Sequence, residues 1–233
     1  VLDIKVGNGT FMKTMEQARD LGRWMKKIGI AFNIETDIVF TNMNQPLGRF
    51  AGLACEVQES IKALKGNGPK DLMDVTFELG AKLLIQAKLV NHKDGAIKLQ
   101  QSLIDSGKAL AAFETMVDAQ GGRLDELDSN AKPDHETVVH APEDGIIEWM
   151  DTEFIGWTLV DLGCGRKNPG DSLDNTAGIE FLKKVGEETQ KGDPVYRLFN
   201  SDPERLNSAS SMLEETFSTE ESAQDSVLIL GNL

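Results

Sequence analysis

The sequence predicts a mixed α/β protein in which a helix-rich first part is followed by a second part richer in strands. Three observations lead to this fold class. The first forty residues read as strand, helix and strand. Apolar residues then recur at helical spacing as far as residue 120, and short β-forming segments punctuated by Gly and Pro follow. This order favours an α/β portion followed by an α+β portion.

The opening segment predicts one α/β crossover unit. Apolar and polar residues alternate over residues 2–6, as in a strand with one buried face. Thr14 and Gln17 have the spacing of a capping box, so a helix is expected to start there and to end near Gly29. The apolar stripe of this helix consists of Ala18, Leu21, Met25 and Ile28. Alternation over residues 34–40 predicts the second strand.

Four further helices are predicted before residue 120. Apolar residues recur at helical spacing over 49–65, 70–90, 94–105 and 108–119. Glycine-rich breaks at residues 66–69 and 121–122 separate or end them.

The character of the sequence changes near residue 130, where we place a domain boundary. Residues 123–136 are polar and acidic, which is typical of a linker. The β-forming segments that follow are 137–140, 146–150 and 157–162. The large aromatic residues of this part, Trp149, Phe154 and Trp157, are expected in its core. From Ser208 onward we expect a helix with a loosely held end.

Composition narrows the classes of function. The chain has 24 Lys and Arg against 38 Asp and Glu, a net charge of −14. Such a surface repels nucleic acid and anionic membranes, although a local pocket can still attract a small anion. No stretch approaches the roughly 20 apolar residues of a membrane span. With only Cys55 and Cys164, a disulfide framework is not expected, and a reduced, cytoplasmic setting fits best.

A set of short motifs is specific as a combination. They are DIKVG and GTFMKT within residues 3–14, TNMNQPLGR at 41–49, EVQE at 56–59, KGNGPKDL at 65–72, AQGG at 119–122 and LGCGR at 162–166. In this order and spacing they resemble the family of thymidine and pyrimidine-nucleoside phosphorylases over nearly the whole chain. Asn42 and Cys164 stand where the family usually has Asp and Ala.

The resemblance implies a fold and an activity. Residues 1–130 would form the C-terminal part of the family's catalytic α/β domain, with a partial mixed sheet of the nucleoside phosphorylase type. Residues 131–207 would form an α+β hammerhead, or half-barrel, and 208–233 a terminal helix and tail. In the family's reaction, inorganic phosphate as co-substrate displaces the base from thymidine or uridine and gives a pentose 1-phosphate. The full-length proteins are homodimers, which leaves the oligomeric state of this chain open.

The family's phosphate loop, Lys-His-Ser-Thr-Gly-Gly, would lie upstream of Val1, together with the side chains that hold the pyrimidine ring. The glycine-rich stretches at 7–9, 66–68 and 163–165 lack the Lys and Ser or Thr that a phosphate cradle requires at a helix start. We therefore expect a C-terminal fragment that contains no catalytic residue and is inactive alone.

Two kinds of site residue follow from the resemblance. The family binds a potassium ion through two backbone carbonyls of its Gln-Pro-Leu-Gly segment and a downstream Glu, which here match Leu47, Phe50 and Glu59. Carbonyl dipoles can replace the hydration shell of a large monovalent cation. Without the resemblance, Glu59 reads as an exposed helix residue. The resemblance also places Phe11 at the pocket wall near the pyrimidine 5-substituent, with simple burial in the core as the alternative.

Other functions remain open. Residues 141–145, 185–187 and 191–195 resemble the half-barrel of biotinyl and lipoyl carriers, where Lys167 is the one candidate for modification, in the wrong sequence context. A non-catalytic remnant of a phosphorylase is a third possibility. The histidines, His92, His135 and His140, do not have the spacing of a zinc site.

Overall fold

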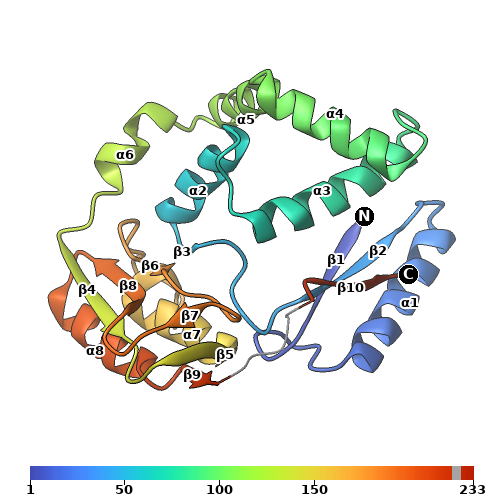
Figure 1. The fold of residues 1–233 in the computed structure, drawn as a ribbon. Coiled ribbons are helices and arrows are strands. Elements are labelled where there is room, and N and C mark those ends of the chain that lie inside the picture. Colours follow the sequence, from blue (N-terminus) through green and yellow to red (C-terminus); the bar gives the residue numbers. More distant parts are fainter. Residues whose placement is uncertain (222–226) are drawn as a thin grey trace.

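The computed structural model describes residues 1–221 and 227–233, and it has the mixed α/β fold that the sequence predicts (Figure 1). Its strands form three small open sheets, of three, four and three strands. Within the described residues, none of the helices is both long and apolar enough to cross a membrane.

The first sheet joins the two ends of the chain. Strand β1 (Leu2–Val6) pairs in parallel with β2 (Ile38–Asn42), with Leu2 opposite Ile38, and helix α1 (Met15–Ala31) connects them. Strand β10 (Ile229–Asn232) pairs with β2 in the antiparallel sense. Both chain ends therefore lie beside β2, as Figure 1 shows.

The expectations for α1 hold at its start and fail at its end. Thr14 and Gln17 form both hydrogen bonds of the capping box. The helix continues past Gly29, which is buried and lies so close to Thr36 that a Cβ there would overlap it. Residues 34–36 turn back against this glycine instead of forming a strand, so β2 begins only at Ile38. Ile28, expected in the apolar stripe, is 56% exposed.

The predicted helical region is confirmed with one correction. The helices are α2 (Ala54–Leu64), α3 (Lys70–Gln86), α4 (Lys93–Asp105) and α5 (Lys108–Ala119). The expected helix over 49–65 starts only at Ala54, because Phe50–Gly52 forms the short strand β3. Gly48 and Gly52 both have positive φ, at 74° and 157°, which a helix excludes. Two short helical segments, η1 (Leu124–Glu126) and α6 (Leu127–Asn130), occupy the predicted linker.

The second half of the chain, here residues 131–233, contains most of the strands that the structure describes. Besides β10, its strands are β4 (His135–His140), β5 (Gly145–Met150), β6 (Gly178–Phe181), β7 (Glu188–Thr189), β8 (Pro194–Asn200) and β9 (Phe217–Glu220). Together with β3 of the first half, they form sheets in the orders β3-β6-β8-β4 and β7-β5-β9. Tyr196 lies at the centre of the core, where its ring makes edge contacts with Phe181 and Phe217.

Two expectations for this half were wrong. Residues 157–162, expected as a strand, belong to helix α7 (Thr152–Leu159) and the π-helical turn η2 (Val160–Cys164), because the Asp151 side chain caps α7 by accepting from the Phe154 amide. The aromatic residues expected in the core are partly exposed, with Trp157 at 59%. The core is filled instead by smaller aliphatic residues and by the rings of Tyr196, Phe181 and Phe217.

The expectation of a terminal helix and tail over 208–233 also needs correction. Helix α8 (Pro203–Leu213) starts before residue 208, where Asp202 caps it and Pro203 occupies its first turn. Two strands follow it: β9 pairs with β5, and β10 pairs with β2. The strand pairings, which link distant parts of the chain, override the local helical character of the tail.

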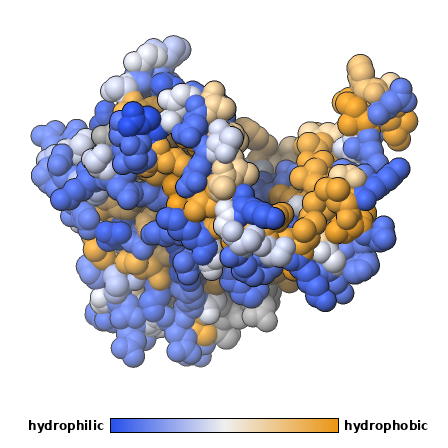
Figure 2. Space-filling model, turned by 90° about the horizontal axis from the view of Figure 1, so that it is seen from above, coloured by the Kyte–Doolittle hydropathy of each residue, from blue (hydrophilic) through white to orange (hydrophobic). Residues whose placement is uncertain are grey.

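Apolar side chains remain exposed around the end of α1. The largest of them are Trp24, Ile28, Ile30, Phe32 and Ile34, and Phe32 is 72% exposed. Figure 2 shows apolar side chains gathered on part of the molecular surface. Large apolar side chains exposed close together along one segment favour association.

We therefore expect the isolated chain to self-associate in spite of its net charge of −14. The double variant Ile30→Ser, Phe32→Ser removes part of the apolar surface and should lower the apparent mass in light scattering. Lys108→Ser, at an exposed polar position on α5, is the control and should leave it unchanged. A wild-type chain that stays monomeric at all concentrations would contradict this expectation.

Candidate functional site

Two segments that contain predicted site residues follow the parallel strands of the first sheet. The motif loop, residues 45–50, comes after β2, and the turn of residues 7–14 comes after β1. Carboxyl ends of parallel strands meet at one edge of a sheet, which is where ligands of open α/β sheets bind. Asn8 N–H donates to Asn44 Oδ1 at 2.8 Å, and Gly9 N–H donates to Met43 O at 3.0 Å. The turn is thus joined to the residues between β2 and the motif loop, at the expected position of a site.

The motif loop bends over Glu59 of helix α2. Gly48 has φ of 74°, and a Cβ at this position would overlap the Glu59 carboxylate, so both the backbone conformation and the space require glycine. The Arg49 amide donates to Glu59 Oε1 at 2.9 Å, and the Phe50 amide also donates to this carboxylate. Glu59 is only 6% exposed, and burial raises its pKa although the two amides partly offset this effect.

A second carboxylate, Asp71 in the first turn of α3, holds the same loop. Its Oδ2 accepts from the Gly48 amide at 3.0 Å and from Lys184 Nζ at 2.9 Å. Burial alone would raise the pKa of Asp71, but the charge and hydrogen bond of Lys184, with the amides of Leu72 and Gly48, lower it overall. Asp71 therefore stays ionised beside the loop.

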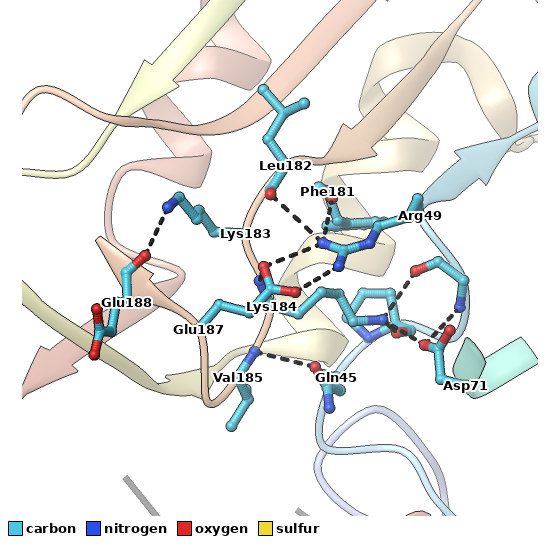
Figure 3. A network of polar contacts seen from close by, with 12 residues as sticks. Gln45, Arg49, Asp71, Phe181, Leu182, Lys183, Lys184, Val185, Glu187 and Glu188 are labelled. Atoms are coloured by element: carbon cyan, nitrogen blue, oxygen red, sulfur yellow. Dashed lines mark hydrogen bonds and ion pairs between the residues drawn. The ribbon is translucent and has the colours of Figure 1, made fainter. Parts of the chain in front are cut away.

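The second half contributes two charged residues from the turn between β6 and β7 (Figure 3). Lys184 Nζ donates to the carbonyl oxygens of Pro46 and Gly48 as well as to Asp71. Arg49 forms two hydrogen bonds with the Glu187 carboxylate, the first at 3.2 Å from Nη1 to Oε2. The hydrogen bond to Glu187 raises the pKa of Arg49. Burial would raise the pKa of Glu187, but the hydrogen bond and charge of Arg49 outweigh this effect. The pKa of Glu187 is therefore lowered overall.

The turn of residues 7–14 also contacts the second half. Asn8 Nδ2 donates to Met150 O at 2.8 Å, and the Thr152 amide donates to Asn8 Oδ1 at 3.0 Å. Lys13 forms an ion pair with Glu153 at 2.7 Å. Gly9 allows this approach, since a Cβ there would overlap Thr152. The start of α7 thereby holds the turn in place.

Leu47, Phe50 and Glu59 lie in or under the motif loop, and Phe11 lies in the neighbouring turn. Leu47 and Phe50 belong to the loop that wraps Glu59, so the reading of Glu59 as an exposed helix residue is wrong. Phe11 is 93% exposed, so the alternative that it is a core residue is also wrong. Its side chain is available at the surface beside the end of the sheet.

Sequence reasoning missed the residues that hold these segments. Asp71 lies inside the KGNGPKDL motif, so its motif membership was a usable signal. Lys184, Glu187 and Asn8 gave no comparable signal, because their partners lie more than a hundred residues away in the sequence.

Lys167, the one candidate for carrier modification, follows η2 instead of standing at the tip of a β-hairpin. Its ammonium pairs with Asp161, and its amide donates to Asp171. Both contacts fit an ordinary surface loop.

The ion pair between Arg49 and Glu187 predicts a dependence of stability on pH. Because the pKa of Glu187 is lower in the folded state, its contribution is present above the unfolded value of about 4.3 and is lost as the pH falls through the folded value. Glu187→Gln should lower the free energy of unfolding by about 1 kcal/mol or less at pH 7, since the pair is partly exposed. Urea unfolding should show this difference shrinking below about pH 4. Glu188→Gln, at the exposed neighbour, is the control, and a deficit for Glu187→Gln that stays constant down to pH 3 would contradict the prediction.

Comparison with known proteins supports the relation that the motifs indicate. Residues 146–220 match the family model described as the pyrimidine nucleoside phosphorylase C-terminal domain. The pyrimidine-nucleoside phosphorylase of Bacillus subtilis is 37% identical over 202 residues, which cover 85% of this chain and 47% of that protein. The thymidine phosphorylase of Mycobacterium tuberculosis is 35% identical over 226 residues, covering 95% of this chain and 50% of that protein.

A shorter relative is covered more fully. The thymidine phosphorylase of Metamycoplasma hominis is 34% identical over 206 residues, covering 87% of this chain and 76% of that protein. The chain spans about half the length of most of the relatives it matches. With the motif order, the loop around Glu59 and these similarities taken together, the chain belongs to the family of pyrimidine-nucleoside and thymidine phosphorylases.

Proposed function

We propose that the protein acts in the phosphate-dependent cleavage of thymidine or uridine to the free base and a pentose 1-phosphate. The observation that carries the proposal is the similarity to a thymidine phosphorylase over 76% of that protein's length. Phosphorolysis is a pentosyl transfer in which phosphate is the co-substrate, and it suits nucleoside salvage in the cytoplasm. Its transition state has oxocarbenium character, so catalysis rests on holding phosphate against C1′ and stabilising the departing base.

The placement of the candidate site supports this proposal. The motif loop and the turn of residues 7–14 lie at the carboxyl edge of the parallel strands β1 and β2, where an α/β sheet binds its ligand. Phe11 offers an exposed ring in that turn, and we assign it to the wall of the pyrimidine pocket. An aromatic ring beside a planar base contributes both contact area and favourable stacking.

The groups that bind phosphate are proposed to lie outside these 233 residues, since the relatives are about twice as long. On this proposal, residues 1–130 are the C-terminal part of the catalytic domain, 131–207 a hammerhead-like domain, and 208–233 a terminal segment. The complete protein would be a homodimer.

A potassium site at Leu47, Phe50 and Glu59 is part of the proposal. The Glu59 carboxylate is buried under the motif loop, and burial raises its pKa, so a cation beside it would offset an unfavourable charge. Backbone carbonyls of the loop would supply the remaining ligands, so the bulk of Phe50 does not exclude the site.

A chimera tests the proposed activity. Residues 1–233 would replace the matching segment of the Bacillus subtilis phosphorylase, and release of thymine and uracil would be followed with and without phosphate. We expect phosphate-dependent release by the chimera and none by the 233-residue chain alone. In the chimera, Phe11→Ala should raise KM for the nucleoside about fivefold, the effect of losing about 1 kcal/mol of ring contact.

Phe154→Ala, at a phenylalanine that is 41% exposed, is the control and should leave KM unchanged. A chimera that folds, by circular dichroism and thermal unfolding, yet releases no base would refute the proposed activity and favour a non-catalytic remnant. Release by the chain alone would refute the assignment of the phosphate site to residues outside it.

Potassium binding has its own test, independent of activity. Potassium chloride should raise the unfolding midpoint of the chain by about 2–4 °C over choline chloride at equal ionic strength, the shift expected for about 1 kcal/mol of binding in a chain of this size. Glu59→Gln should abolish the shift. Glu56→Gln, on the exposed side of the same helix, should retain it. Equal midpoints of the wild-type chain in the two salts would contradict the assignment.

A further inference from the structure

Lys184 is a buried lysine whose ammonium is fully engaged with oxygens of the first half. The residue is 6% exposed. Its Nζ donates to the carbonyl oxygen of Pro46, to that of Gly48 at 2.9 Å, and to Asp71 Oδ2 at 2.9 Å (Figure 3). An ammonium group has three donors, so these three oxygens, here called the oxygen cage, satisfy it completely.

The contacts of the Lys184 ammonium differ from those of an ordinary surface ion pair. Lysine is almost never fully buried unless its charge is paired, because removing an ammonium from water costs several kcal/mol. Here one carboxylate balances the charge, and two carbonyl dipoles replace the water. The same Asp71 oxygen also accepts from the Gly48 amide at 3.0 Å. The Gly48 amide therefore has an acceptor in Asp71, and the carbonyls of Pro46 and Gly48 have a donor in Lys184.

The turn that carries Lys184 is itself fixed against the motif loop. The Lys184 amide donates to Glu187 Oε2 at 3.1 Å, and that carboxylate binds Arg49 of the loop. On the other side of Lys184, the Val185 amide donates to Gln45 Oε1 at 3.1 Å. Backbone and side chain thus bring the lysine to one position, where its ammonium forms an ion pair with Asp71.

We propose that Lys184 is a positioning residue whose ammonium acts as a built-in cation of the motif loop, held in the oxygen cage as a free primary ammonium ion would be. The second half of the chain thereby sets the conformation of the loop that bends over Glu59. The inference rests on the proposed function only in assigning this loop to the active site. The cage itself is tested without any measurement of phosphorolysis, so a failed chimera would leave that test intact.

The experiment compares Lys184→Ala with Lys184→Met. The alanine variant leaves empty both the cage and the space of the lysine stem. The ion n-propylammonium has the size of the missing Cγ, Cδ, Cε and Nζ atoms. The unfolding midpoint of the alanine variant should fall by at least about 5 °C, because the partly buried Asp71 carboxylate loses its partner. The salt n-propylammonium chloride should restore about half of this loss. Tetramethylammonium chloride has no N–H donor and should restore none.

The methionine variant fills the channel without a charge. Its midpoint should also fall, and n-propylammonium should not restore it, because the cage is no longer accessible. Hydrogen exchange should show the Gly48 and Arg49 amides exchanging at least about tenfold faster than in the wild type, since the loop opens locally, while amides of β8 stay unchanged. Lys183→Ala, at the more exposed neighbour, is the control and should behave as the wild type.

The wild-type chain provides a measurement that does not depend on folding of a variant. Under native conditions, Lys184 should be acetylated at least about tenfold more slowly than Lys183, because its amine reacts only after local opening. Acetylation of the two lysines at equal rates would overturn the proposal. So would a Lys184→Met variant with wild-type exchange at Gly48 and Arg49, or equal recovery of Lys184→Ala in the two ammonium salts.

Discussion

The polar groups of the motif loop need partners away from water, and much of the structure is organised to supply them. A buried peptide group without a partner costs about as much as a lost hydrogen bond. The amides of Gly48 and Arg49 donate to carboxylates from α3 and α2, and the carbonyls on either side of Leu47 accept from a lysine of the second half. The opposite charges also offset each other, because burying either sign alone would cost more. Glycine at position 48 is what lets all of these groups converge.

These contacts of the motif loop lie at the boundary between the two halves of the chain and couple them. Strand β3 begins where the motif loop ends and pairs with β6, so the first half completes a sheet of the second. Strand β10 comes from the end of the chain and pairs with β2, so the second half completes the sheet of the first. The ion pair of Arg49 with Glu187 and the contacts of Asn8 with residues 150–152 lie along the same boundary. Each half contributes one strand to a sheet of the other half. A change at the boundary therefore affects both the β1-β2-β10 sheet and the β3-β6-β8-β4 sheet.

The boundary between the two halves lies where a ligand is expected. Both segments at the carboxyl edge of the parallel strands are held from the second half, one by the turn of residues 184–187 and the other by the start of α7. On the proposed function, the second half is therefore part of the support of the active site. This explains in physical terms why the part that matches the C-terminal family model is packed against the motif loop, and why its charged turn faces inward.

The sequence by itself determined the α/β class, the capping box of α1, the predicted helices α3, α4 and α5, and the family, because these depend on local periodicity and on the order of short motifs. Local patterns failed where long-range pairing decided the outcome. Residues 50–52 became a strand through β6, and residues 229–232 became one through β2. The burial of Glu59 and the exposure of Phe11 and Trp157 were likewise decided by packing. Only the tertiary structure could bring Lys184 to Pro46, Gly48 and Asp71, since a charged side chain is buried only where distant oxygens converge to replace its water.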